Sequence, residues 1–306
     1  MTKRYLIINC DDFGQCKAAN EAIIHLLEEG KVSSATIMPP APAFKEAAAW
    51  SRSRKVPKVG LHLTFTSEYE GNRWRSLTGD PSLHDESGYM HMTIREFEEK
   101  AAPHAVRAEM LAQFRAVQEA GLTITHVDNH MGSLYGLATG RSYLPQVFRE
   151  CGKRGLPFRI FRNVYEKDPL LASIPNAAGI LAKVVALADA LGVAMPDYLL
   201  THVYPVEEGE TYESFKSMLI QKVYDLPEGV SETYIHPAVE DDELKSFLPS
   251  WQKRVWEFEL MQDDDFAYAI KDAGVVMTDY RYVREHLRRP RVAAAFQLLF
   301  KLLFRK

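Results

Sequence analysis

The sequence has few cysteines, no long apolar run and no excess of charge of one sign. Its three cysteines, Cys10, Cys16 and Cys151, lack the spacing of a disulfide framework or a metal site, and so sparse a count is typical of a reducing cytoplasm. No apolar run reaches the roughly 18 residues that a membrane span needs. A net charge of −4 gives no indication of a nucleic-acid partner. A strand pattern begins within about four residues of the first methionine, which predicts that there is no signal peptide.

The sequence does have a regular alternation of strand-like and helix-like segments. Its 306 residues, 46% of them hydrophobic, suffice for one large α/β domain or two smaller ones. Strands are predicted over residues 4–11, 32–38, 56–65, 122–127, 156–162, 198–204, 232–236 and 275–279. Helices are predicted over 18–29, 42–53, 93–121 with an interruption at Pro103, 141–154, 177–191, 211–224 and 250–273. The alternation predicts a single-domain distorted (β/α) barrel of about seven to eight parallel strands, with a doubly wound open sheet as the alternative.

Unusual polar residues stand at the C-terminal ends of the predicted strands. They are Asp11 and Asp12 after the first strand, His62 in the third, His126, Asp128 and His130 after the fourth, Arg159 and Arg162 at the fifth, and His236 after the seventh. In a (β/α) barrel these ends meet on one face, where active sites lie. A lone histidine or arginine at a strand end is more often structural, but the joint placement of all of them indicates a site.

One aspartate and two histidines are a sound set of ligands for a divalent metal ion. A bound ion would also relieve the free-energy cost of burying the adjacent carboxylates of Asp11 and Asp12. His126, Asp128 and His130 share one face of an extended strand, so the spacing alone leaves the choice of ligand open. We favour His130, because it lies nearest the strand end, with His126 and Asp128 as buried partners around the ligands.

Four short motifs carry a resemblance to a known family. They are Asn-Cys-Asp-Asp-Phe-Gly at 9–14, Gly-Leu-His-Leu-Thr-Phe at 60–65, Thr-His-Val-Asp-Asn-His at 125–130 and Ile-His-Pro-Ala at 235–238. In order and spacing over about residues 1–285, the sequence resembles the YdjC-type carbohydrate deacetylases, which include the chitooligosaccharide (diacetylchitobiose) deacetylases. The resemblance implies a distorted (β/α) barrel and metal-dependent removal of N-acetyl groups from small sugars.

The resemblance also implies a role for each matching residue. Asp12, His62 and His130 would bind the metal ion. Asp11 would be the general base, and His236, held as a cation near the carboxylates, would be the general acid. The family is usually assigned Mg²⁺, whereas the ligand chemistry favours Zn²⁺ or a similar transition ion.

The sequence departs from the family pattern at two places. Cys10 stands where Ala is usual, and we interpret it as a substitution in the core. After His130 the chain continues Met131-Gly132-Ser133-Leu134-Tyr135, and not with the histidine-rich continuation of the chitooligosaccharide deacetylases. The set of metal ligands is intact, but the identity of the sugar is left open.

Several other residues are candidates for contact with the substrate. Arg159 and Arg162 would orient Asp11 or bind substrate, or else form structural ion pairs, and Trp74 and Tyr135 are further candidates for substrate binding. The long polar loop 66–92, with Tyr69, Trp74, Tyr89 and Met90 expected to be exposed, would either stack on sugar rings or form a partly buried lid.

The last segment, residues 288–306, lies outside the resemblance and has helical spacing of apolar residues with basic flanks. The favoured interpretation is a helix packed on the barrel formed by residues 1–287. The alternatives are a helix that forms a homodimer and a helix that rests on an anionic membrane surface. For the whole chain, the competing functions are a metal-dependent phosphoesterase and a non-catalytic sugar-binding protein.

Overall fold

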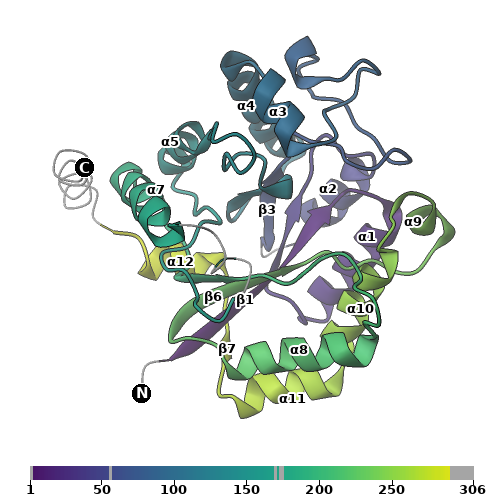
Figure 1. Ribbon diagram of the computed structural model, residues 1–306, viewed down its shortest axis with the longest axis vertical. Coiled ribbons are helices and arrows are strands. Elements are labelled where there is room, and N and C mark those ends of the chain that lie inside the picture. The colour runs from purple at the N-terminus through teal and green to yellow at the C-terminus, as the bar shows by residue number, and fades with distance from the viewer. Residues whose placement is uncertain (1–2, 55–56, 169–170, 172–175, 290–306) are drawn as a thin grey trace.

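The chain folds around one parallel sheet. The computed structural model describes residues 3–54, 57–168, 171 and 176–289. The strands are β1 (Arg4–Phe13), β2 (Ser34–Ile37), β3 (Val59–Leu63), β4 (Val127–Asn129), β5 (Tyr198–Leu200), β6 (Gly229–Ile235) and β7 (Val276–Met277). Their order is β4-β3-β2-β1-β6-β5, and β7 pairs with the N-terminal part of β1. Every pair is parallel, so the C-terminal ends of the strands lie at one edge of the sheet (Figure 1).

An irregular segment, residues 156–163, spans the gap between the two outer strands β4 and β5. The N–H of Arg159 donates to Val127 O at 2.9 Å, and the N–H of Phe158 donates to Ala194 O at 3.0 Å. These bonds connect β4 to the chain that leads into β5. The sheet is therefore a distorted barrel, as the alternation predicted, and not a doubly wound open sheet.

Helices pack outside the strands (Figure 1). They are α1 (Lys17–Glu28), α2 (Phe44–Arg52), α3 (Ile94–Lys100), α4 (Pro103–Glu119), α5 (Leu144–Arg154), α7 (Ala177–Leu191), α8 (Tyr212–Tyr224), α9 (Asp242–Phe247), α10 (Trp251–Gln262), α11 (Asp264–Asp272) and α12 (Tyr280–His286), with 3₁₀ turns η1 (Pro81–Leu83) and η2 (His130–Gly132). In the part of the chain that the structure describes, no helix combines the length and apolar character that a membrane crossing needs.

Three segments differ from the structure expected from the sequence. The strand expected over 122–127 coincides with β4 only at Val127. The expected strand 156–162 forms only the isolated bridge between Val127 and Phe158, in part because Pro157 has no N–H to donate to a ladder. Residues 239–249, which lie between the predicted strand 232–236 and the predicted helix 250–273, contain the additional helix α9, whose first turn is capped by the side chain of Asp241. The C-terminal helix expected over 288–306 falls, apart from Arg288 and Arg289, outside the described residues.

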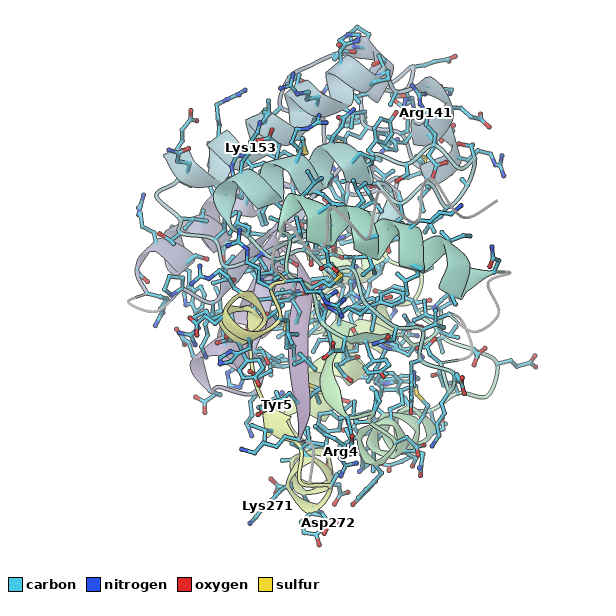
Figure 2. All side chains as sticks on the ribbon, turned by 90° about the vertical axis from the view of Figure 1, so that its left-hand side faces the viewer. Arg4, Tyr5, Arg141, Lys153, Lys271 and Asp272 are labelled. Carbon is cyan, nitrogen blue, oxygen red and sulfur yellow. The ribbon has the colours of Figure 1, made fainter. Side chains whose placement is uncertain are left out.

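The strands that carry the site are buried on both faces. Leu6, Ile7 and Ile8 of β1 are no more than 1% exposed, which is typical of a parallel strand covered on both sides. At the opposite end from the site, the Arg4 guanidinium donates to Tyr224 O at 3.1 Å and to Ala273 O. Figure 2 shows Arg4 and Tyr5 at the start of β1, close to the end of α11 at Lys271 and Asp272, and shows Arg141 and Lys153 toward the other end of the molecule. The N-terminal ends of the strands are therefore anchored away from the site.

Candidate metal centre and active site

Asp12, His62 and His130 meet at the C-terminal ends of β1, β3 and β4. Asp12 Oδ1 lies 3.4 Å from His62 Nε2 and 3.1 Å from His130 Nδ1, and all three residues are buried. Successive side chains of a regular strand point to opposite faces. Here Asp12 has a φ of +62°, and the pairing of β1 with β2 shifts its register at this point. This kink lets both Asp11 and Asp12 face His62.

The outer nitrogen of each of these imidazoles is held by a carboxylate. His62 Nδ1 lies 2.7 Å from Asp128 Oδ1, and His130 Nε2 lies 2.8 Å from Glu68 Oε2. Metal-binding histidines usually have a carboxylate on the nitrogen that does not bind the metal, because this fixes the orientation of the ring. His62 Nε2 and His130 Nδ1 are thus left facing Asp12.

The carboxylates make the site attractive to positive charge. Burial by itself lowers the pKa of His62, but Asp128 and Asp12 outweigh burial and raise it to about 9. Burial also opposes the charged form of His130, yet Glu68 and Asp12 raise its pKa to about 10. Protons and a metal ion compete for the same ring nitrogens. The site therefore favours a bound cation.

Asp12 offers one oxygen for such a cation. Asp12 Oδ2 accepts a hydrogen bond from Arg254 at 2.7 Å, whereas Oδ1 is buried and has no hydrogen-bond donor among the described residues. Buried polar atoms without a partner are uncommon and call for an explanation. One carboxylate oxygen and two imidazole nitrogens, each within 4.8 Å of the others, fit a single divalent ion with open positions for other ligands.

Asp11 is held by a buried arginine. Arg159 donates to Asp11 Oδ2 at 2.5 Å and to Asp11 Oδ1 at 2.7 Å, and its Nε donates to Glu232 Oε1 at 2.9 Å. Asn9 Nδ2 donates to Asp11 Oδ1 at 2.9 Å. A two-point contact of this kind fixes the plane of the carboxylate. Of the three roles expected for Arg159, namely orientation of Asp11, substrate binding or a structural ion pair, the first stays a prediction that this contact makes possible.

A second group of possible ligands, Asp11, His62 and Asp128, lies beside the first. The Arg159 guanidinium takes part in this group, because its Nη2 lies 2.7 Å from Asp11 Oδ1 and 2.9 Å from Asp128 Oδ2. An arginine keeps its positive charge at any physiological pH. Arg159 therefore supplies, at this position, the charge that a second metal ion would supply.

His236 follows β6 and lies on the other side of Asp11. Its Nε2 is 4.0 Å from Asp11 Oδ2, and its side chain is 18% exposed. Burial lowers the pKa of His236, and the nearby carboxylates of Asp12 and Glu257 only partly offset burial. Burial therefore disfavours the charged ring, in contrast to the expectation of a standing imidazolium.

His126 lies away from the three candidate ligands. Its ring stacks on Tyr280 with centroids 3.8 Å apart, and burial lowers its pKa to about 3, so it is neutral. A Cβ at Gly60 would lie 2.6 Å from this ring, so β3 needs glycine where it passes His126. Of the histidines that the spacing left open, His130 is the one that faces Asp12.

Of the other substrate candidates, Trp74 borders the site, because its ring meets the His130 ring edge to face with centroids 5.8 Å apart. Trp74 is 3% exposed, and its indole N–H donates to Thr66 O at 2.9 Å, so its expected exposure for sugar stacking is wrong. Tyr135 donates to Arg159 O at 2.6 Å. Arg162 forms a two-point ion pair with Asp189 at 2.9 Å for both bonds, which is a structural role.

In the rest of loop 66–92, the expected exposure is also partly wrong. Met90 is fully buried, while Tyr69 and Tyr89 are half-buried. Arg73 and Arg75 both lie over the ring of Tyr89. Of the two alternatives for loop 66–92, the observed burial therefore favours a partly buried lid over an exposed surface that stacks on sugar rings.

Three residues of the site escaped the sequence analysis. Arg254 and Glu257 come from α10, and Glu68 comes from loop 66–92. Charged residues in a helix usually face solvent, so nothing in the local sequence marked Arg254 and Glu257. Their spacing of three residues places both on one face of a helix, but it does not show whether that face meets solvent or the barrel.

The comparisons with known proteins agree on one family. The sequence profile of the family described as YdjC-like protein matches residues 5–272. Several proteins described as carbohydrate deacetylases are similar over nearly their whole length. The one from Enterococcus faecalis is 30% identical and covers 92% of this chain and 98% of its own. The one from Thermoanaerobacter pseudethanolicus is 26% identical and covers 92% of this chain and 100% of its own.

A solved structure supports the same fold. The crystal structure of a protein from Enterococcus faecalis, described as a cellobiose-phosphate cleavage protein, is similar with a TM-score of 0.71 and 26% sequence identity. The match covers 92% of this chain and 98% of that protein. The distorted barrel is therefore shared over essentially the full length of the relative.

Removal of either candidate imidazole ligand tests the metal centre. His62→Ala or His130→Ala removes a nitrogen that faces Asp12 Oδ1, and each variant is expected to lose most of its bound divalent metal. Metal content per folded chain, measured by elemental analysis, provides the readout. His126→Ala is the matched control, because it removes a buried histidine that stacks on Tyr280 and should leave the metal content unchanged. Full metal occupancy in both His62→Ala and His130→Ala would refute the assignment.

Proposed function

Because the chain belongs to the YdjC-like family, we propose that it is a metal-dependent carbohydrate deacetylase that hydrolyses the N-acetyl groups of small N-acetylated sugars. The relatives described as carbohydrate deacetylases support the reaction class. The observation that carries the proposal is the joint placement of Asp12, His62 and His130 beside Asp11, with His236 across from it. This arrangement offers a cation site, a base and an acid within one cluster.

The candidate ligands would hold one divalent ion through a carboxylate oxygen and two ring nitrogens. When bound, such an ion polarises an acetyl carbonyl and lowers the pKa of a water from 15.7 to about 7. Two imidazoles and one carboxylate favour Zn²⁺ or a similar transition ion, whereas the family resemblance implies Mg²⁺. Asp128 and Glu68 hold the two rings, and Arg254 holds Asp12 Oδ2, which would leave Oδ1 to bind the ion.

Asp11 would act as the general base. Arg159 and Asn9 fix its carboxylate, while Asp11 Oδ2 remains within 4.0 Å of His236 Nε2. A carboxylate held in this way removes a proton from the attacking water without having to reorient during the reaction.

His236 would act as the general acid for the leaving amine. Because burial lowers its pKa, the ring must gain a proton before it can donate one. The nearest group of the proposed mechanism that gains a proton during the reaction is Asp11, across the 4.0 Å gap. We therefore propose that the proton of the water passes from Asp11 through His236 to the departing nitrogen.

The competing functions are less well supported. A two-metal phosphoesterase needs a second divalent ion, but Arg159 supplies the charge beside Asp11, His62 and Asp128. A non-catalytic sugar-binding protein has no need for a fixed carboxylate and an imidazole next to a cation site. A screen of N-acetylated sugars for acetate release, with several divalent metals and with phosphate esters in parallel, tests the proposal. Acetate release is expected from at least one sugar, and phosphate release alone would favour the phosphoesterase.

The base assignment predicts the effect of Asp11→Asn. The amide is nearly the same size as the carboxylate and retains one oxygen for Arg159, so the fold and most of the metal should be kept. The amide cannot take a proton from water, and kcat should fall by about 10²-fold or more. Steady-state acetate release with parallel metal analysis measures both quantities. Turnover at the wild-type rate in Asp11→Asn would show that the two aspartates have been assigned the wrong roles.

The acid assignment predicts a change in pH dependence for His236→Ala. Loss of the imidazole should lower kcat by roughly 10²–10⁴-fold and remove one limb of the pH–rate profile. Sugars with a leaving amine of lower basicity should be affected less, because their departure needs less protonation. A pH–rate profile with the same shape in the wild type and in His236→Ala would eliminate the acid role.

A further inference from the structure

His236 is held at its backbone by a buried carboxylate. Its N–H lies just beyond the end of β6, outside the sheet ladder, and donates to Glu257 Oε2 at 2.7 Å. Glu257 belongs to α10 and is fully buried. A hydrogen bond to a buried charged acceptor is among the stronger ones in proteins, so the position of this backbone depends on Glu257.

The second oxygen of Glu257 reaches the neighbouring strand end. Glu257 Oε1 lies 2.8 Å from His202 Nε2, and the His202 side chain is 3% exposed. His202 follows β5 by two residues, and β5 pairs with β6 in parallel. Glu257 therefore bridges the chain segments that leave β5 and β6, at the point where the chain turns toward the site.

The ring of His236 is held by aromatic contacts. Its Nδ1 is buried and has no hydrogen-bond partner in the described part of the chain. The rings of Tyr204 and Tyr234 meet it edge to face, with centroids 4.9 Å and 5.7 Å away. The Tyr204 hydroxyl in turn accepts a hydrogen bond from Arg254 Nε at 2.5 Å.

Arg254 connects this arrangement to the metal ligands. The guanidinium that donates to Tyr204 also donates to Asp12 Oδ2 at 2.7 Å. Arg254 and Glu257 are three residues apart and lie on one face of α10. The helix α10 thus holds the candidate metal ligand Asp12 through Arg254. The same helix holds the backbone of His236 through Glu257.

We propose that Glu257 is a positioning residue for His236, and that α10 fixes the separation between the metal centre and the general acid. This inference rests on the proposed deacetylase function. The need for positioning is physical: the acid must reach the leaving nitrogen while the acetyl carbonyl stays at the metal. A displacement of about 1 Å can lower the rate of such a reaction by about 10²-fold.

Variants of the bridge separate positioning from stability. Glu257→Gln keeps an oxygen for the His236 N–H, and its kcat should stay within a few-fold of the wild type. Glu257→Ala loses both contacts, and kcat should fall by about 10²-fold with KM and metal content unchanged. His202→Ala frees one oxygen of Glu257 without touching His236, and it should give an intermediate loss even if Glu257→Ala does not fold.

Lys253→Gln is the matched control on the same helix. Lys253 is 1% exposed, ion-pairs with Glu210, and packs between Phe215 and Trp256. Its replacement removes a buried ion pair of α10 without touching His236 or Asp12. The melting temperature should fall, while kcat per metal-loaded chain should stay at the wild-type value.

The imidazole signals of His236 in ¹H–¹⁵N spectra provide a readout that does not depend on activity. They are identified by their loss in His236→Ala. One set of signals is expected in the wild type and Glu257→Gln, and shifted, doubled or broadened signals in Glu257→Ala and His202→Ala. Unchanged signals and kcat in a Glu257→Ala or His202→Ala protein of lowered melting temperature would assign Glu257 a purely structural role and overturn the inference. A wild type that releases no acetate would defeat the proposed function, while these spectra would still test the positioning.

Discussion

The site depends on buried carboxylates that share a small number of buried positive groups. Asp11, Asp128 and Glu232 all contact the single guanidinium of Arg159, and burial raises the pKa of Glu232 to about 7 in spite of this contact. Taking charges out of water is costly unless they are paired and hydrogen-bonded. Removal of Arg159 would leave several uncompensated charges at the centre of the barrel. The irregular segment 156–163 is thus as important to the site as the regular strands, because it delivers this arginine.

The same principle divides the two adjacent aspartates between two roles. Arg159 engages both oxygens of Asp11, whereas Arg254 engages only Oδ2 of Asp12. Asp12 Oδ1 is left without a donor between two ring nitrogens, where a cation can satisfy it. Both oxygens of Asp11 already accept hydrogen bonds from its arginine, so Asp11 does not need the cation as a partner. Two neighbouring carboxylates of identical chemistry therefore acquire different functions from the arginines that approach them.

The sequence predicted the strand-end residues of the site but not the contacts that orient them. Asp12, His62 and His130 could be found because parallel strands end at one edge and because short motifs surround these residues. Arg254 and Glu257 could not, because an arginine and a glutamate inside a helix have the same local pattern whether they face solvent or a buried site. Their function depends on which face of α10 meets the barrel, and this depends on tertiary packing.

The predictions for Trp74 and Arg162 differ from the structure for similar physical reasons. Trp74 stands in a polar loop and was expected to be exposed, yet its ring packs with Met38 and Met90 and its N–H finds a backbone carbonyl. Arg162 lies three residues after Arg159 in the irregular segment, but it pairs with Asp189 of α7 and not with Asp11. In both cases the local sequence shows which groups need a partner, and only the fold determines which partner is within reach.

Backbone strain is concentrated on both sides of the candidate metal centre. Among the described residues other than glycine, positive φ values occur at Asp12 (+62°), Met131 (+56°) and Asn176 (+55°). Asp12 is a candidate ligand and Met131 follows one directly. Such conformations cost about 1–3 kcal/mol each and persist where the surrounding structure enforces them. The Met131 side chain is 45% exposed, and it stands where the chitooligosaccharide deacetylases that the sequence resembles continue with histidines. The fold therefore brings the candidate ligands together and presents an apolar side chain on the residue that follows His130.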